Sequence, residues 1–580
     1  MEKPVKKYIS DLKEKKYFIP TITMIIFLSI AVGITSMLKN IVGTKQSDVS
    51  IATNSAEVAF YNRKYDIAIA EYTKLQEQEK EWPIWNVKIA EVYSVKGEFV
   101  KSNELIEKVY QARNKIIDTK KEQDGNFEIK DKELVNYIIF TSLMNGESKK
   151  ALEYGELFLK KYSTDKTLLR TMFTVYMVNG NKDKAKEIVD NYPRTAETAS
   201  DLAILARMNM LVDNFDAGFS LLKDAWHKDK NEVKVFDVIA QITDYNKTDI
   251  LDKILKLDKK EPNELAYKIW EAKIYSMSKD STEKARELVD KLANEDVGNV
   301  NLMIIKANMY QNMGEMEKSK KVLDDIIEDN VNSFLGYHVA AWQDYNNGKY
   351  NEALKNCIKS IVMNKDYPDN YGFLMPEIMA KQNKGKDVEP YFRTALYKEP
   401  FNYSIIIKIA EYYGNTIKDT TKALYYYDLA SKIKPNDAEI YYNMALIKLN
   451  NQREDEAIEL LKKSIAVDDK VPKYHRALGT VYLNKQKNAD AIKEIRNAYA
   501  IDKTDILTLN NAGCYYISID GDVDRGMVNL KSAYDGINKE ISAEDRDTIT
   551  ENYKRVKDLS DAYHKRNGAT LIIPDLKLFY

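Results

Sequence analysis

The chain has 580 residues, which is too long for a single hydrophobic core, so it must consist of several domains or of an array that adds core unit by unit. Its 88 Lys and Arg residues almost balance its 89 Asp and Glu residues. This balance gives no overall field that would attract nucleic acid, and no nucleic-acid partner is expected. The two cysteines, Cys357 and Cys514, lie far apart, which argues against a disulfide framework or a metal site.

The N-terminal region contains an uncharged run of 22 residues, Tyr17–Leu38, which as a helix would be about 33 Å long. It predicts a transmembrane helix, preceded by a basic segment 1–16 and followed by a linker 39–48. Because segment 1–16 holds six lysines, the positive-inside rule puts the N-terminus in the cytoplasm. We therefore expect a single-pass cell-membrane protein whose later residues are extracytoplasmic. The alternative, a cleaved signal peptide, would have a shorter apolar run and a small-residue cleavage site.

From residue 49 onward, small residues recur at regular intervals. Ala56 and Ala68 are 12 positions apart, and Ala90 follows Ala68 by 22. Apolar residues between these points follow the three- and four-residue spacing of amphipathic helices. We expect one block of helix pairs over 49–265 and a second over 266–540, with the boundary in the poorly matching stretch 232–262. A capping helix and a tail should follow in 541–580, and we expect the tail to pack on the cap or to serve as a small docking segment.

The clearest copies of this pattern lie between Ala438 and Asp505 and are 34 residues apart. In both, the three small residues are separated by 12 and then by 7 positions: Ala445, Ala457 and Ser464 in the first, and Gly479, Ala491 and Ala498 in the second. A 34-residue period with small residues at these places resembles the tetratricopeptide repeat, a helix-turn-helix unit. About fourteen units of this kind fit between residues 49 and 540.

The resemblance implies an all-α fold, a right-handed α-solenoid with a concave groove lined by the first helix of each pair. It also implies binding of peptides or proteins in that groove, without chemistry of its own. The register places in the groove the following residues: Tyr442, Leu446, Leu449, Asn450, Arg476, Thr480, Leu483, Asn484, Asn510, Cys514 and Ile517. Their mixture of amides and apolar groups suits an extended peptide. The alternative is a solvated inner face without a ligand.

One specialised version of the family clamps a C-terminal carboxylate with Lys, Asn and Arg side chains from three units. Asn443 matches the middle Asn of that clamp, and Lys473 matches one basic residue. Ile407, Glu411 and Ala477 occupy the other places. This departure predicts that the carboxylate clamp is absent.

Enzyme chemistry finds no support in the sequence. The four histidines, His227, His338, His475 and His564, fall in separate units, and there is no phosphate-binding glycine loop. We expect no enzyme, no catalytic or metal-binding residues and no cofactor. The sequence predicts a membrane-anchored scaffold for protein–protein interaction in a bacterial cell envelope. The alternatives are a cell-wall polymer or glycan binder that uses the groove's Tyr and Asn residues and an accessory subunit of an envelope-modifying enzyme. The run Tyr425–Tyr427 could also stack on sugars, although at helical spacing such a run is more often repeat core with one exposed ring.

Overall fold

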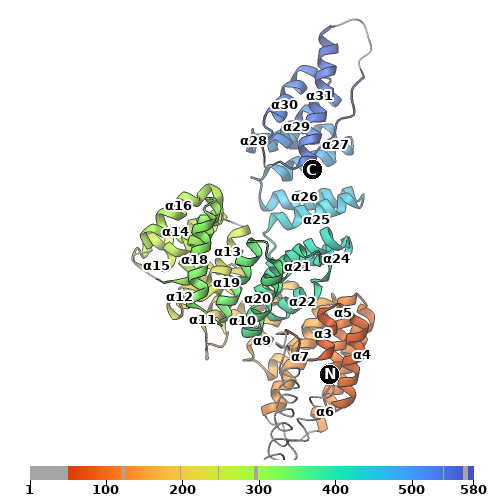
Figure 1. Ribbon diagram of the computed structural model, residues 1–580. Coiled ribbons are helices and arrows are strands. Elements are labelled where there is room, and N and C mark those ends of the chain that lie inside the picture. Colours follow the sequence, from red (N-terminus) through yellow and green to blue (C-terminus); the bar gives the residue numbers. More distant parts are fainter. Residues whose placement is uncertain are drawn as a thin grey trace, which may run out of the picture.

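A computed structural model describes residues 50–119, 125–195, 197–245, 247–292, 298–539, 541–565 and 572–580. Within these ranges the chain is all-α, with no strand, and consecutive helices pack in pairs (Figure 1). The predicted all-α solenoid is confirmed at this level. The handedness of its superhelix and the boundary between residues 265 and 266 stay predictions.

The helices follow one another with short turns. The first part of the array contains α3 (Ser55–Tyr61), α4 (Tyr65–Gln78), α5 (Ile84–Lys96), α6 (Phe99–Thr119), α7 (Gly125–Met144), α8 (Ser148–Lys161), α9 (Lys166–Val178), α10 (Lys182–Asp190), α11 (Ala199–Leu211) and α12 (Phe215–Lys228). The next part contains α13 (Val233–Tyr245), α14 (Lys247–Lys260), α15 (Leu265–Ser276), η1 (Lys279–Ser281), α16 (Thr282–Leu292), α17 (Val300–Asn312), α18 (Met316–Asp329), α19 (Phe334–Asn346) and α20 (Tyr350–Met363).

The second half is built in the same way. It continues with η2 (Asn370–Leu374), α21 (Met375–Lys381), η3 (Gly385–Asp387), α22 (Glu389–Lys398), α23 (Tyr403–Glu411), η4 (Tyr412–Ile417) and α24 (Thr420–Ile433). It ends with α25 (Ala438–Asn450), α26 (Glu454–Val467), α27 (Pro472–Asn484), α28 (Asn488–Ile501), α29 (Ile506–Tyr515), η5 (Tyr516–Asp520), α30 (Val523–Asp535) and α31 (Ala543–Lys565).

The small residues of the 34-residue pattern lie where the helices of a pair cross. Ala445 and Ala457 are fully buried between α25 and α26. A Cβ atom added at Gly479 would lie 2.9 Å from Ile495 Cγ1, and one at Gly513 would lie 2.6 Å from Leu530 Cγ. Because no side chain separates the helices at these points, each pair can pack at short range.

In at least two units the small residues are 13 rather than 12 positions apart, and the sequence suggests an extra residue at the turn. In the unit of Gly513 and Gly526, the first helix ends in a π-helical segment, η5. In the unit of Ala272 and Ala285, the short 3₁₀ helix η1 precedes the second helix. The extra residue is thus accommodated as a change of helix type next to the turn, which keeps the following helix in register.

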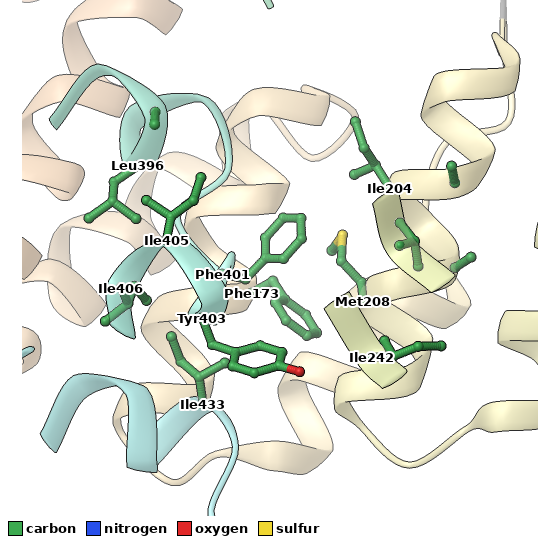
Figure 2. Packing of buried hydrophobic residues seen from close by; sticks show 14 of the residues in the cluster. Phe173, Ile204, Met208, Ile242, Leu396, Phe401, Tyr403, Ile405, Ile406 and Ile433 are labelled. Atoms are coloured by element: carbon green, nitrogen blue, oxygen red, sulfur yellow. The ribbon is translucent and has the colours of Figure 1, made fainter. Parts of the chain in front are cut away.

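The array folds back on itself. Helices α22–α24 pack against the first helices of the N-terminal pairs, α3, α5 and α9 (Figure 1). Figure 2 shows Phe401, just before α23, beside Phe173 of α9 and Met208 of α11, and Tyr403, the first residue of α23, pointing toward Ile242 of α13. The rings of Phe173 and Phe401 are 5.7 Å apart in an edge-to-face arrangement. One buried cluster consequently extends from Trp82 to Ile440, on both sides of the predicted block boundary.

The predicted membrane anchor requires a correction. Among the described residues, no helix is both long and apolar enough to cross a lipid bilayer, and the long helix α31 carries charged residues throughout. By this finding the predicted localisation, a single-pass cell-membrane protein with a cytoplasmic N-terminus, is wrong. The span Tyr17–Leu38, the segment 1–16 and the linker 39–48, on which that prediction rests, lie outside the described residues.

Candidate peptide-binding groove

The last residues of the sequence, 572–580, have no regular secondary structure and lie among α27, α29 and α31 (Figure 1). We call residues 572–580 the tail, and the surface of α27, α29 and α31 that contacts it the tail groove. These three helices are the first helices of their pairs and the capping helix, so the tail occupies the inner face that the sequence assigns to ligand binding. The occupant is a segment of the chain itself.

Two asparagines hold the backbone of the tail. Asn552 of α31 donates to Lys577 O (2.8 Å) and accepts from Lys577 N (3.1 Å). Asn511 of α29 donates to Phe579 O (2.7 Å) and accepts from Phe579 N (2.9 Å). In an extended chain the N–H and C=O of one residue point to the same side, and a neighbouring strand bonds both. The two carboxamides therefore bond the tail as a neighbouring strand would, Asn552 at Lys577 and Asn511 at Phe579.

Neighbouring polar groups orient these amides. The second hydrogen of the Asn552 amide goes to Asn510 Oδ1 (2.9 Å), and that of Asn511 goes to Thr480 Oγ1 (2.9 Å). Asn510 Nδ2 also donates to Lys577 O (3.0 Å), and the Thr480 hydroxyl donates to Phe579 O (2.6 Å). The three asparagines and Thr480 are almost completely buried. Buried amides without partners are costly, so the tail completes a polar network that the helices alone leave open.

The tail residues differ in exposure, and those with apolar contacts are half-buried. Leu576 and Leu578 pack against a cluster that includes Ile517, Leu530 and Val556. Phe579 packs against a second cluster, which consists of Ile506, Leu509, Ala533 and Ile549 and their neighbours. The side chains of Asp575 and Lys577 are exposed. The groove thus contacts apolar side chains at some tail positions and only the backbone at others.

The ends of the tail are held by longer polar side chains. Arg555 donates to Asp575 O (2.7 Å), Asn484 donates to the Tyr580 hydroxyl (2.9 Å), and Arg476 lies 3.5 Å from Tyr580 O. Arg476 is itself buried and forms an ion pair with Asp505, which caps α29. This ion pair fixes the position of the guanidinium at one end of the groove.

Cys514 lies on the floor of the groove as a protonated thiol. Burial raises the pKa of Cys514 to about 12, so the thiol stays neutral near pH 7. Its sulfur is 3.7 Å from Lys577 O, a weak donor contact. Cys514 therefore contributes packing and a weak hydrogen bond to the tail and has no thiolate character.

Of the eight main residues predicted for the groove, which are Tyr442, Leu446, Asn450 and five others, those five contact the tail: Arg476, Thr480, Asn484, Asn510 and Cys514. The other three belong to α25, outside the tail groove. Tyr442 packs with Tyr474 at a ring distance of 5.3 Å, Leu446 joins the same core, and Asn450 is exposed. Of the further residues in the register, Ile517 packs with Leu576 and Leu578, whereas Leu449 and Leu483 are half-buried in the repeat cores. A role of this set in binding a partner stays a prediction.

Sequence reasoning missed Asn511, Asn552 and Arg555. The 34-residue spacing could have identified Asn511, because it lies 34 residues after Ala477 and 68 after Asn443, a position already considered for the carboxylate clamp. No sequence pattern could have identified Asn552 and Arg555, since α31 does not follow the 34-residue spacing. The tail itself was expected to pack on the cap or to serve as a docking segment.

A second concave surface of the chain is filled in a different way. The inner helices α3, α5, α7, α9, α11 and α13 form a surface, here called the N-terminal groove, that is occupied by α22–α24. Glu399 lies 2.7 Å from Arg207 and 2.7 Å from Lys234, and all three side chains are nearly completely buried. Arg393 pairs with Glu91 at 2.7 Å. Tyr397 stacks on Tyr137 with their ring centres 4.1 Å apart.

The charges in the N-terminal groove shift one another's ionisation. Burial opposes the ionised form of Glu399, but Lys234 and Arg207 outweigh it and hold the pKa of Glu399 below its ordinary value. Burial also raises the pKa of Asp369 to about 7, against the opposing effect of Lys234, whose Nζ is 3.8 Å away. The two carboxyls share one lysine, and only Glu399 is held firmly in the ionised state.

Comparison with known families now agrees with the geometry. Residues 418–481, from η4 to α27, match the family model described as "Tetratricopeptide repeat". This segment of the chain is similar to tetratricopeptide repeats. No curated protein shows a significant match to it.

Solved structures with stacked tetratricopeptide repeats are similar at low identity. The Cut9–Hcn1 hetero-tetramer of the APC/C matches at 13% identity, covering 86% of this chain and 95% of that chain, with a TM-score of 0.36. Yeast Tom70 matches at 16% identity over 89% of this chain and 98% of its own, with a TM-score of 0.34. PilF of Pseudomonas aeruginosa matches at 14% identity over 41% of this chain and 98% of its own, with a TM-score of 0.31. At these scores the matches carry no inference about function.

Proposed function

We propose that this protein is a non-catalytic tetratricopeptide repeat scaffold whose tail groove binds an extended segment of a partner protein. The observation that supports it is the pair of buried amides, Asn511 and Asn552, each bonded to both backbone groups of one residue of an extended chain. Backbone bonding combined with pockets for alternate side chains is a common way for proteins to recognise peptides. A sugar would not present alternating backbone N–H and C=O groups at this spacing.

The glycan alternative has no observation in its favour. Tyr426 and Tyr427 are buried, and the Tyr425 hydroxyl donates to Leu143 O (2.9 Å) between the two halves of the fold. Tyr427 thus belongs to the core of the array, and Tyr425 is held by its contact with the N-terminal half at the edge of a cavity that Arg393 and Lys422 also line. A role as subunit of an envelope-modifying enzyme likewise rests on no contact in the described residues.

A peptide added in trans tests the proposed function. The protein would carry Leu576→Ser, Leu578→Ser and Phe579→Ser, here called the tail variant, which removes the apolar anchors of the tail. A fluorescent peptide with the sequence of residues 572–580 should bind this variant saturably in an anisotropy titration. Adding Asn511→Ala and Asn552→Ala should weaken binding at least tenfold, because the backbone bonds are lost. A folded tail variant that does not bind the peptide, with an unchanged circular dichroism spectrum, would contradict the proposal.

A further inference from the structure

We infer that the tail is a built-in competitor for the tail groove, and that partner segments share its pattern of apolar, any, apolar, aromatic, aromatic residues at positions 576–580. This inference rests on the proposed function, since it concerns the regulation and the ligand class of the same groove. The partner is thus an extended protein segment that resembles the chain's own tail and must displace it.

The pattern follows from what each tail residue contacts. Leu576, Leu578 and Phe579 fill apolar sites, whereas Lys577 contributes its backbone and has a side chain that is 61% exposed. Tyr580 is held through its hydroxyl by Asn484. Position 577 therefore accepts many side chains, and positions 576, 578 and 579 require apolar ones. A charged residue at position 578 would be placed against the apolar cluster of Leu530 and Val556 at a high desolvation cost.

The tail is held firmly enough to occupy the groove and loosely enough to leave it. Its anchors are only half-buried, and Ile572 and Ile573 remain 85% and 49% exposed. No buried ion pair joins the tail to the helices of the groove within the described residues. Leaving the groove thus exposes apolar side chains that are already half-exposed and strands no buried charge of the tail.

The covalent connection decides the competition. A short tether keeps the tail at an effective concentration in the millimolar range. A segment with a Kd of about 100 µM in trans would then occupy its own groove about ten to one. The apparent affinity of an outside segment should fall by about the same factor.

The test compares the full chain with the tail variant, using the labelled peptide of residues 572–580 as probe. We expect binding to the tail variant to be about tenfold tighter than to the unmodified chain. Lys577→Ala is the matched control and should leave the affinity of the full chain unchanged. A second labelled peptide with Ser at the positions of Leu576, Leu578 and Phe579 should bind neither protein.

The possible results are distinguishable. Equal affinity for both chains would overturn the competition and leave the proposed function intact, whereas no binding to either would overturn both. A full chain that sediments as a dimer, and becomes a monomer in the tail variant, would show that the tail occupies a second copy and would overturn the intramolecular assignment.

A measurement on the unmodified chain makes the test independent of the folding of any variant. Hydrogen exchange of the amides of Lys577 and Phe579 should be slow in the free chain, since both are bonded to asparagine. A saturating amount of an isotope-labelled peptide of the same sequence should accelerate it. Unchanged exchange under saturation would overturn the inference.

Discussion

The N-terminal groove and the tail groove are both filled by other parts of the same chain, but the bonds that hold the two occupants differ. In the N-terminal groove the occupant is a set of folded helices, joined by buried ion pairs such as Arg207–Glu399 and Glu91–Arg393 and by stacked rings. In the tail groove the occupant is an extended segment with half-exposed side chains, held through its backbone. If α22–α24 left the N-terminal groove, buried charges would lose their partners in an apolar core. If the tail left the tail groove, it would expose amides that water can reach. We conclude that only the tail groove is built to exchange its occupant.

The largest effect should follow from removing a buried charge of the N-terminal groove. Glu399→Ala leaves Arg207 and Lys234 buried without their carboxylate, which should cost about 3–5 kcal/mol. Urea unfolding followed by the fluorescence of the buried Trp226 and Trp270 would report it. Glu459→Ala, which breaks an exposed pair with Lys462, is the control and should leave the transition in place. Equal behaviour of the two variants would mean that the groove is not closed by these charges.

The next effect is the dependence on pH that Asp369 in the N-terminal groove contributes. Asp369 has a folded pKa of about 7, above its ordinary value of 3.8. Between these two values the folded chain binds more protons than the unfolded chain, so stability from this group is greatest at low pH and is lost as pH rises toward 7. Urea midpoints at pH 5 and pH 8 should therefore differ less in Asp369→Asn than in the unmodified chain. Asp366→Asn, an exposed neighbour, should keep the original difference.

A smaller effect is expected when one of the two asparagine amides that bond the tail backbone is removed. Asn511→Ala or Asn552→Ala should lower the free energy of local opening of the tail by about 1–3 kcal/mol, because each removes two bonds to one residue. The readout is hydrogen exchange at Lys577 and Phe579, with the global urea midpoint almost unchanged. Asn450→Ala removes an exposed amide of α25 that does not meet the tail and should leave the exchange rates as they were. A lower global urea midpoint in Asn511→Ala or Asn552→Ala would show that the tail is needed for the stability of the whole fold and is not an exchangeable segment.

The smallest effect concerns the side chain at a position where only the backbone is bonded. Lys577→Ala removes an exposed ammonium 3.5 Å from Glu551 and keeps both bonds to Asn552. Exchange of the tail amides should not change measurably. Faster exchange would show that the side chain, rather than the backbone, holds this residue.

Local periodicity predicted what is local in this fold. The spacing of Ala445, Ala457 and Gly479 identified helix pairs and their inner face, because a repeat stacks mainly on its neighbours. The same register pointed to Thr480 and Asn510, although it could not show that the occupant of the groove is the chain's own tail. It could not predict the pairing of Glu91 with Arg393, which are 302 residues apart and carry no periodic signal. Asn552 could not be predicted for a related reason, since the capping helix does not follow the 34-residue period.

The closure of the N-terminal groove also has a consequence for the order in which the chain is made. A solenoid can usually fold from its first repeat as it leaves the ribosome, because its contacts are between neighbours. Here Glu91 is translated long before Arg393, and Lys234 and Arg207 long before Glu399. Until about residue 434 has been synthesised, the early repeats expose apolar surface and charges whose partners do not yet exist. The nascent chain should therefore be most vulnerable to aggregation and most dependent on chaperones during that interval.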